Sequence, residues 1–156
     1  MQFINYFIAS LISYLGLLIG FLLVKIAPEE QKPLEKIFLI LRKAILLLIF
    51  GFVTLYYYSN PAYLPILILS FIFLLFIEYK AKSILRKSML AYSILGILFF
   101  LSSKNINLFT IISSLILLHG LPAGSLLYDK RQKNLFEVFL QNIGFIITAN
   151  FLYFIF

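Results

Sequence analysis

Residues 108–134 read LFTIISSLILLHGLPAGSLLYDKRQKN. The first part is an apolar run, and the last part is a basic turn at 130–133. Between them lie His119, the single histidine of the chain, and the helix-breaking run 120–124. A helix needs about 20 predominantly apolar residues to cross a bilayer, and an ionisable side chain inside such a helix is costly. The stretch therefore predicts a membrane helix and supplies the first candidate for a functional site.

The same alternation of apolar runs and short polar turns continues along the whole chain. The composition is 63% hydrophobic and 12% charged, whereas soluble domains carry about 25% charged residues. No hydrophilic span is long enough for a separate soluble domain. Residues 1–156 are therefore expected to form a single all-α transmembrane domain of six helices in three hairpins, with the two shortest segments extended as helix by turn residues. The expected segments are 3–26, 34–58, 62–79, 89–103, 108–128 and 135–156.

The distribution of positive charge predicts the orientation in the membrane. Twelve of the 13 basic residues lie at 25–43, 78–88 and 129–134, and Lys104 stands alone on the other side. Short loops rich in Lys and Arg face the cytoplasm. The three basic turns are therefore expected to be cytoplasmic in a cell membrane, with both termini outside. This placement also explains the net charge of +7 without nucleic acid. The expected partners are the bilayer and its anionic lipid headgroups.

Several chemistries are excluded or disfavoured by composition. The chain has no cysteine and one histidine, which excludes disulfides, thiolate catalysis and a multi-histidine metal site. We expect no metal and no cofactor. Glu137 is the one candidate for an acid inside the membrane, because Glu78 and Asp129 are expected in turns, and there is no GxSxG nucleophile motif. An enzyme is therefore disfavoured.

A seam of small residues follows one face of the first segment. Ala9, Ser13, Gly16 and Gly20 recur at helical spacing, and the last two form a GxxxG motif. Small residues allow two helices to approach closely in lipid. We expect a packing seam within the chain, although a seam between copies or with another membrane protein is the alternative.

The sixth segment carries a polar stripe. Glu137, Gln141, Gly144 and Thr148 fall on one helical face. Polar side chains inside a membrane are expected to face protein or water. Because the fifth and sixth segments are joined by a short turn, His119 is predicted to lie at the level of Gln141. The candidate polar site is therefore His119, Gln141, Glu137 and Thr148.

Two interpretations of the 119–124 run remain open. In the first, Gly120, Pro122 and Gly124 open the helix, and His119 relays a proton beside the freed carbonyls. In the second, the helix is only kinked and a neutral histidine is hydrogen-bonded to its neighbours. The first favours transport, by a carrier or channel-like protein for a small solute or ion. The alternative function is a non-catalytic scaffold or assembly subunit. The sequence does not identify a substrate or an oligomeric state.

Two charged positions have simpler interpretations. Arg42 and Lys43 are expected to extend to the lipid headgroups. Glu78 is expected to be a surface ion-pair partner for the basic residues around it, since Lys80, Lys82, Arg86 and Lys87 are close in sequence.

The first basic turn resembles one found in a known group of proteins. Pro28-Glu29-Glu30-Gln31-Lys32-Pro33, followed by Glu35-Lys36 and an apolar helix, is similar to a turn in uncharacterised small multi-pass membrane proteins of archaea. The resemblance covers about thirty residues and implies no activity and no site residues. An excess of Lys over Arg, with abundant Ile, Phe and Asn, suits a prokaryotic AT-rich genome.

Overall fold

The computed structural model describes residues 2–58, 64–80, 83–128 and 134–155. These residues form helices and no strand, which confirms the all-α prediction. The helices are α1 (Phe3–Ile26), α2 (Gln31–Tyr57), α3 (Leu64–Lys80), α4 (Ile84–Ser102), α5 (Ile106–Leu127), α6 (Leu135–Asn142) and α7 (Gly144–Ile155).

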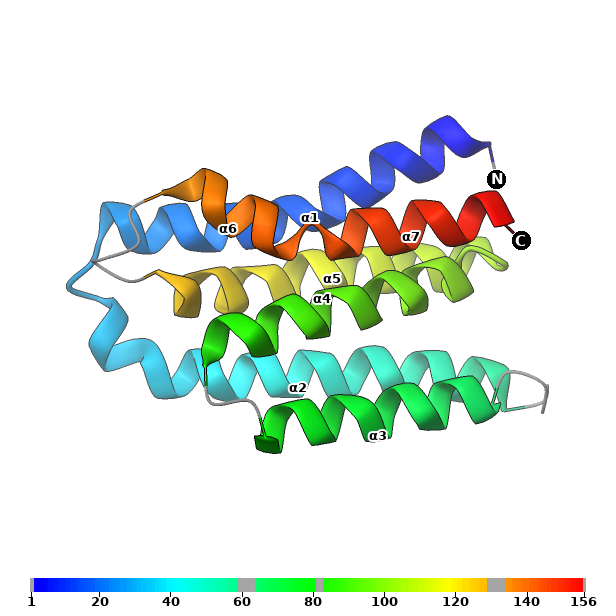
Figure 1. Cartoon of the computed structure of the whole chain (residues 1–156), viewed down its shortest axis with the longest axis horizontal. Coiled ribbons are helices and arrows are strands. Elements are labelled where there is room, and N and C mark those ends of the chain that lie inside the picture. The colour runs from blue at the N-terminus through cyan, green and yellow to red at the C-terminus, as the bar shows by residue number, and fades with distance from the viewer. Residues whose placement is uncertain (1, 59–63, 81–82, 129–133, 156) are drawn as a thin grey trace.

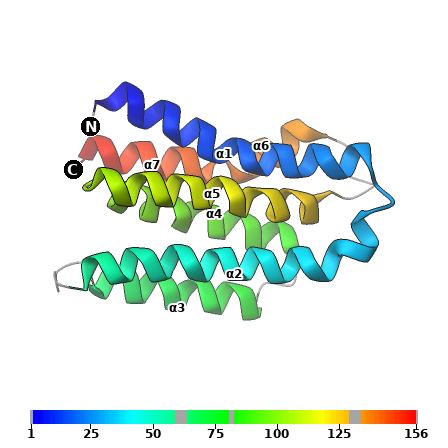
Figure 2. The ribbon, with the colours of Figure 1, turned by 180° about the vertical axis from the view of Figure 1, so that it is seen from behind.

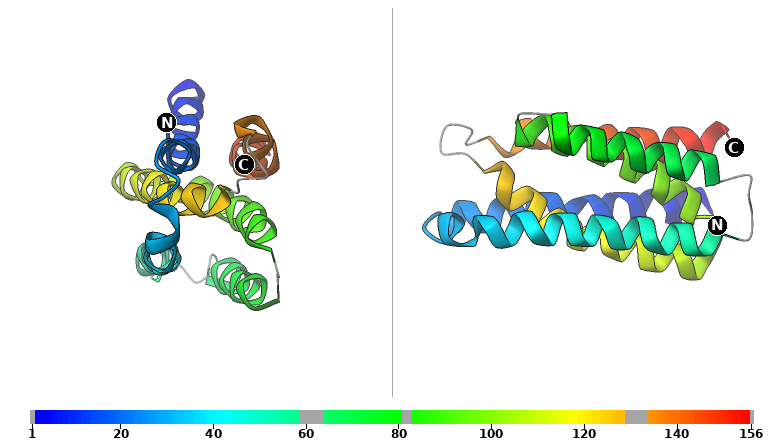
Figure 3. Two further views of the ribbon diagram at one scale, coloured as in Figure 1. Left: turned by 90° about the vertical axis from the view of Figure 1, so that its left-hand side faces the viewer. Right: turned by 90° about the horizontal axis from the view of Figure 1, so that it is seen from below.

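The helices run side by side along the long axis of the molecule (Figures 1 and 2). The end of α1 and the beginning of α2 lie at one end of the bundle with the end of α5, and both chain termini lie at the other end (Figure 1). Viewed along the axis, α5 lies in the middle, between α1 and α2, with α4 beside it (Figure 3). The most extensive contacts are those of α5 with α1 and with α2. The stretch at 108–127 is thus the central helix.

Five segments of the described chain are long and apolar enough to cross a membrane, and α3 adds a sixth of 17 residues. At 1.5 Å per residue, α3 is about 25 Å long and α2 about 40 Å. Helix α4 begins at Ile84, so it does include turn residues, and the Ser83 hydroxyl caps it by accepting from the Arg86 N–H. The sixth segment differs from the prediction because it is two helices, interrupted at Ile143.

Helices α1 and α5 meet through glycines on both sides. A Cβ atom added to Gly16 would lie 2.0 Å from the Leu117 carbonyl oxygen, and one on Gly20 would lie 2.1 Å from that of Leu121. The facing glycines are Gly120 and Gly124, whose added Cβ atoms would lie within 2.4 Å of the backbone of Leu17. Two GxxxG motifs therefore pack against each other, and the seam of the first segment is used within the chain.

Buried tyrosines join distant helices. The Tyr6 hydroxyl donates to the Ala149 carbonyl at 3.0 Å, the Tyr14 hydroxyl to the Phe139 carbonyl at 2.8 Å, and the Tyr57 hydroxyl to the Leu101 carbonyl at 2.7 Å. A buried hydroxyl needs a hydrogen-bond partner. These bonds fix α1 against α6 and α7, and α2 against α4.

Candidate functional site

The predicted histidine lies in the interior of the bundle. His119 is 2% exposed, and its Nδ1 atom has no hydrogen-bond partner among the described residues. Its ring lies 5.8 Å from that of Tyr92, centroid to centroid, and the Tyr92 hydroxyl is also buried without a partner. The surroundings of His119 are therefore packed side chains, and it does not line any of the grooves described below.

Helix α5, which carries His119, is not a main packing partner of α6 and α7, which carry the other three predicted polar residues. Helix α5 packs on α1, α2 and α4, whereas α6 and α7 pack mainly on α4 and α1. Tyr92 lies between them, with its ring against both His119 and Phe145. Adjacency in sequence therefore did not predict adjacency in space.

The members of the polar stripe have different surroundings. Glu137 is exposed, and Gln141 is half-buried with an unpartnered Oε1 atom. Thr148 packs against α4, because an added Cβ atom on Gly96 would lie 3.0 Å from the Thr148 Cβ. Gly144 contacts α4 in the same way, at Ser93. The C-terminal part of the stripe, Gly144 and Thr148, thus packs on α4.

The predicted helix break at Gly120, Pro122 and Gly124 is corrected by the structure. Helix α5 continues from Ile106 to Leu127 with Pro122 inside it. Proline has no N–H, so it cannot donate to the carbonyl of Leu118 one turn earlier. Close packing of Gly120 and Gly124 on α1 accounts for the two glycines. Gly120 and Gly124 have the same four-residue spacing as Gly16 and Gly20, and this spacing in the sequence indicates a second surface for close helix packing.

The prediction that Arg42 extends to the lipid headgroups is also corrected by the structure. Arg42 is 4% exposed and forms an ion pair with Glu78 of α3, rather than extending to the headgroups. Lys87 of α4 is also bound to Glu78, with its Nζ 3.7 Å from Oε2 and donating to the backbone carbonyl at 2.8 Å. This charged cluster, Arg42, Glu78 and Lys87, joins three helices. Glu78 is an ion-pair partner as expected, but its main partner is 36 residues away.

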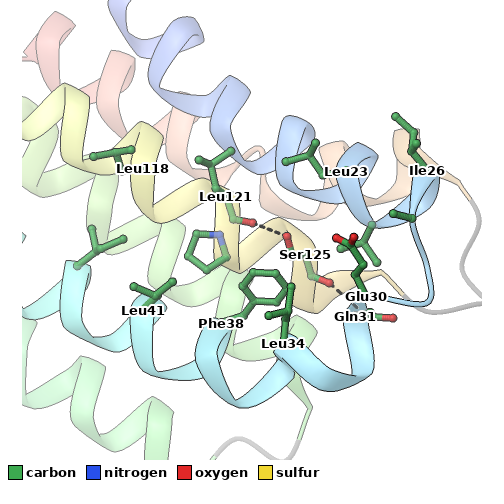
Figure 4. Close-up of a pocket in the computed structure, with 14 residues that line it drawn as sticks. Leu23, Ile26, Glu30, Gln31, Leu34, Phe38, Leu41, Leu118, Leu121 and Ser125 are labelled. Carbon is green, nitrogen blue, oxygen red and sulfur yellow. Dashed lines mark hydrogen bonds between the residues drawn. The ribbon is translucent and has the colours of Figure 1, made fainter.

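A groove of about 580 Å³ lies between α1, α2 and α5, and it is named here the main groove. This volume falls in the usual range for small-molecule sites. Figure 4 shows leucine and isoleucine side chains contributed by all three helices, with Phe38 between α2 and α5. Along α2 the groove extends from Glu30 to Ile45, which is about 22 Å at the helical rise. It is therefore long and narrow.

One end of the main groove is polar. Glu30, Gln31 and Ser125 are the polar residues in its lining, and no basic side chain lines it. The Gln31 amide donates to the Ser125 carbonyl at 3.1 Å (Figure 4) and to the Tyr128 carbonyl at 2.7 Å. These bonds satisfy carbonyls at the end of α5. The Ser125 hydroxyl donates to Leu121 and Gly20. In the part of the chain that the structure describes, the Glu30 carboxylate and the Gln31 Oε1 accept no hydrogen bond, so both remain available as acceptors.

A smaller groove of about 180 Å³ lies between α2 and α3, and it is named the hairpin groove. Lys43 and Glu78 line its charged end, and its other lining residues are apolar. It thus begins beside the charged cluster.

The described residues contain no group of histidine, cysteine, aspartate or glutamate that could hold a metal ion. Comparisons with protein-family models, curated proteins and solved structures find no match. The functional interpretation therefore rests on the two grooves and the charged cluster.

Proposed function

We propose that this chain is a small multi-pass membrane protein of the carrier type, whose ligand is a single-chain amphiphile held in the main groove. The observation that carries the proposal is the groove itself, which is apolar, half-open and lined by three helices, with hydrogen-bond acceptors at one end. Ligand sites of this kind combine apolar walls with a few polar groups that fix orientation.

The dimensions and charges favour one class of ligand. A length of about 22 Å and a volume of about 580 Å³ leave a mean cross-section of about 26 Å², which suits one hydrocarbon chain. The rim offers acceptors and no cation, so the head of the ligand should carry hydroxyl or amine donors. A monoacylglycerol or a long-chain alcohol has this chemistry, whereas a phosphate head would be repelled by Glu30.

The site of the carrier is thereby moved from the expected interface of the fifth and sixth segments to the interface of α1, α2 and α5. The scaffold alternative depended on a free seam at Gly16 and Gly20, and that face packs on α5 within the chain. In this proposal the polar end of the groove lies at the cytoplasmic surface, because it adjoins the first basic turn.

Photolabelling in vesicles tests the proposal. The full chain is reconstituted in phosphatidylcholine vesicles with a monoacylglycerol that carries a diazirine and an alkyne on its chain. After irradiation, labelled peptides are mapped. We expect labels concentrated between residues 23 and 45 and between 118 and 125. Labels spread evenly over all lipid-facing surfaces, such as those of α3, would contradict the proposal.

Transport by the same site is measured separately. A fluorescent monoacylglycerol placed in one leaflet should cross to the other at least several times faster in vesicles that contain the protein. Labelling of the groove without faster crossing would reject the carrier and leave a binding protein. Faster crossing without labelling of the groove would reject the site.

A further inference from the structure

The charged cluster carries more positive than negative charge. Arg42 and Lys87 share the single carboxylate of Glu78, and the three side chains are 5%, 22% and 18% exposed respectively. Among the described residues, Glu78 is the acidic side chain that pairs with Arg42 and with Lys87. An uncompensated charge that is largely removed from water is unfavourable unless an anion lies near it.

A third positive side chain lies at the same level. Lys43 is exposed and, with Glu78, lines the charged end of the hairpin groove. Helix α3 ends two residues after Glu78, at Lys80. Helix α2 has twelve residues before Lys43, because it begins at Gln31. The charged groups thus lie where the shorter helix stops.

The groove that begins there is apolar along its length. Leu46, Leu47, Phe71 and Leu74 line it, and Phe50 forms an edge-to-face pair with Phe71 at 5.3 Å between ring centroids. Phe50 is seven residues from Lys43, so this pair lies about 10 Å from the charged end. A chain entering the groove would leave its polar head beside Lys43.

We propose that the hairpin groove and the charged cluster form a binding site for an anionic phospholipid. The phosphate would lie at Lys43, where it would balance the charge of Arg42 and Lys87, and one acyl chain would fill the groove. The site is independent of the main groove, whose acidic rim selects a different head. Its occupant would hold the α2–α3 hairpin against α4, the helix that carries Lys87.

Native mass spectrometry of the full chain in detergent tests this proposal, with dioleoyl phosphatidylglycerol as the probe. Lys43→Gln should weaken binding about fivefold, as expected for the loss of one headgroup charge contact. Lys36→Gln is the matched control, because Lys36 is exposed on the same helix and does not line the groove. Dioleoyl phosphatidylcholine should bind the parent at least several times more weakly, and glycerol phosphate should not compete.

A second pair of variants tests the apolar part without touching a charge. Leu47→Trp should block the hairpin groove, whereas Leu48→Trp should not, although the two leucines are similarly exposed at 55% and 51%. Leu118→Trp, which fills the main groove, should leave phosphatidylglycerol binding unchanged. Equal binding by the Lys43 and Leu47 variants and the parent would overturn the proposal, and so would competition by glycerol phosphate.

Discussion

Gly120 and Gly16 lie in direct backbone contact, since a Cβ atom on Gly120 would lie 2.5 Å from the Gly16 carbonyl carbon. Without side chains at these positions, the backbones of α1 and α5 can approach closely along two GxxxG motifs. Association of apolar helices in lipid depends on this kind of close packing. The α1–α5 pair is therefore the centre of the bundle, to which α2 and α4 are added.

The first prediction concerns this contact. Gly124→Ala places a Cβ 2.0 Å from the Leu17 carbonyl oxygen, so the helices must separate. We expect a loss of about 1–3 kcal/mol in the free energy of unfolding, measured by denaturant titration in micelles. Gly51→Ala is the matched control, because nothing lies within 4 Å of an added Cβ there. It should be neutral or slightly stabilising. Equal losses for the two variants would contradict the packing described.

The second prediction concerns the buried ion pair. Glu78→Gln leaves Arg42 buried without its carboxylate, so it should lower the free energy of unfolding by about 3 kcal/mol. The double variant Arg42→Met with Glu78→Leu removes both charges and should recover most of that loss. The same titration measures both variants. If the loss of unfolding free energy in the double variant equals the sum of the losses in Arg42→Met and Glu78→Leu measured singly, the two residues are not paired.

The third prediction separates the two interpretations of His119. The side chain is buried and its Nδ1 atom has no partner in the described chain, so replacing it by an apolar residue removes a cost. His119→Leu should raise the free energy of unfolding by about 1 kcal/mol and leave amphiphile crossing unchanged. A proton relay requires the opposite, a loss of transport with little change in stability. Stability and crossing are measured on the same preparation.

The fourth prediction concerns orientation, which follows from the charge asymmetry alone. The chain has no cysteine, so single cysteines can report their side of the membrane. Lys104→Cys should react with an impermeant maleimide added to intact cells, and Ser83→Cys should react only after lysis. The reverse pattern would invert the proposed topology and place the polar end of the main groove outside.

The sequence predicts the helices well and their neighbours less well. Apolar run length identifies the long helices, and the spacing of Gly16 and Gly20 predicts a seam. The partner of that seam was missed because Pro122, between Gly120 and Gly124, was interpreted as a helix break. The Arg42–Glu78 pair was missed because a distance of 36 residues gives no local signal. Such contacts depend on which helices are adjacent, and that is decided by packing over the whole bundle.

If the main groove holds one hydrocarbon chain, a side chain that fills the groove should exclude that chain. Leu118→Trp fills the main groove from α5. Ile111→Trp is the matched control, because Ile111 lies on the same helix, is exposed at 41% compared with 47% for Leu118, and does not line the groove. Photolabelling by the diazirine monoacylglycerol should fall at least about fivefold in the Leu118 variant and stay at the parent level in the Ile111 variant. Undiminished labelling of residues 23–45 in the Leu118 variant would contradict the account.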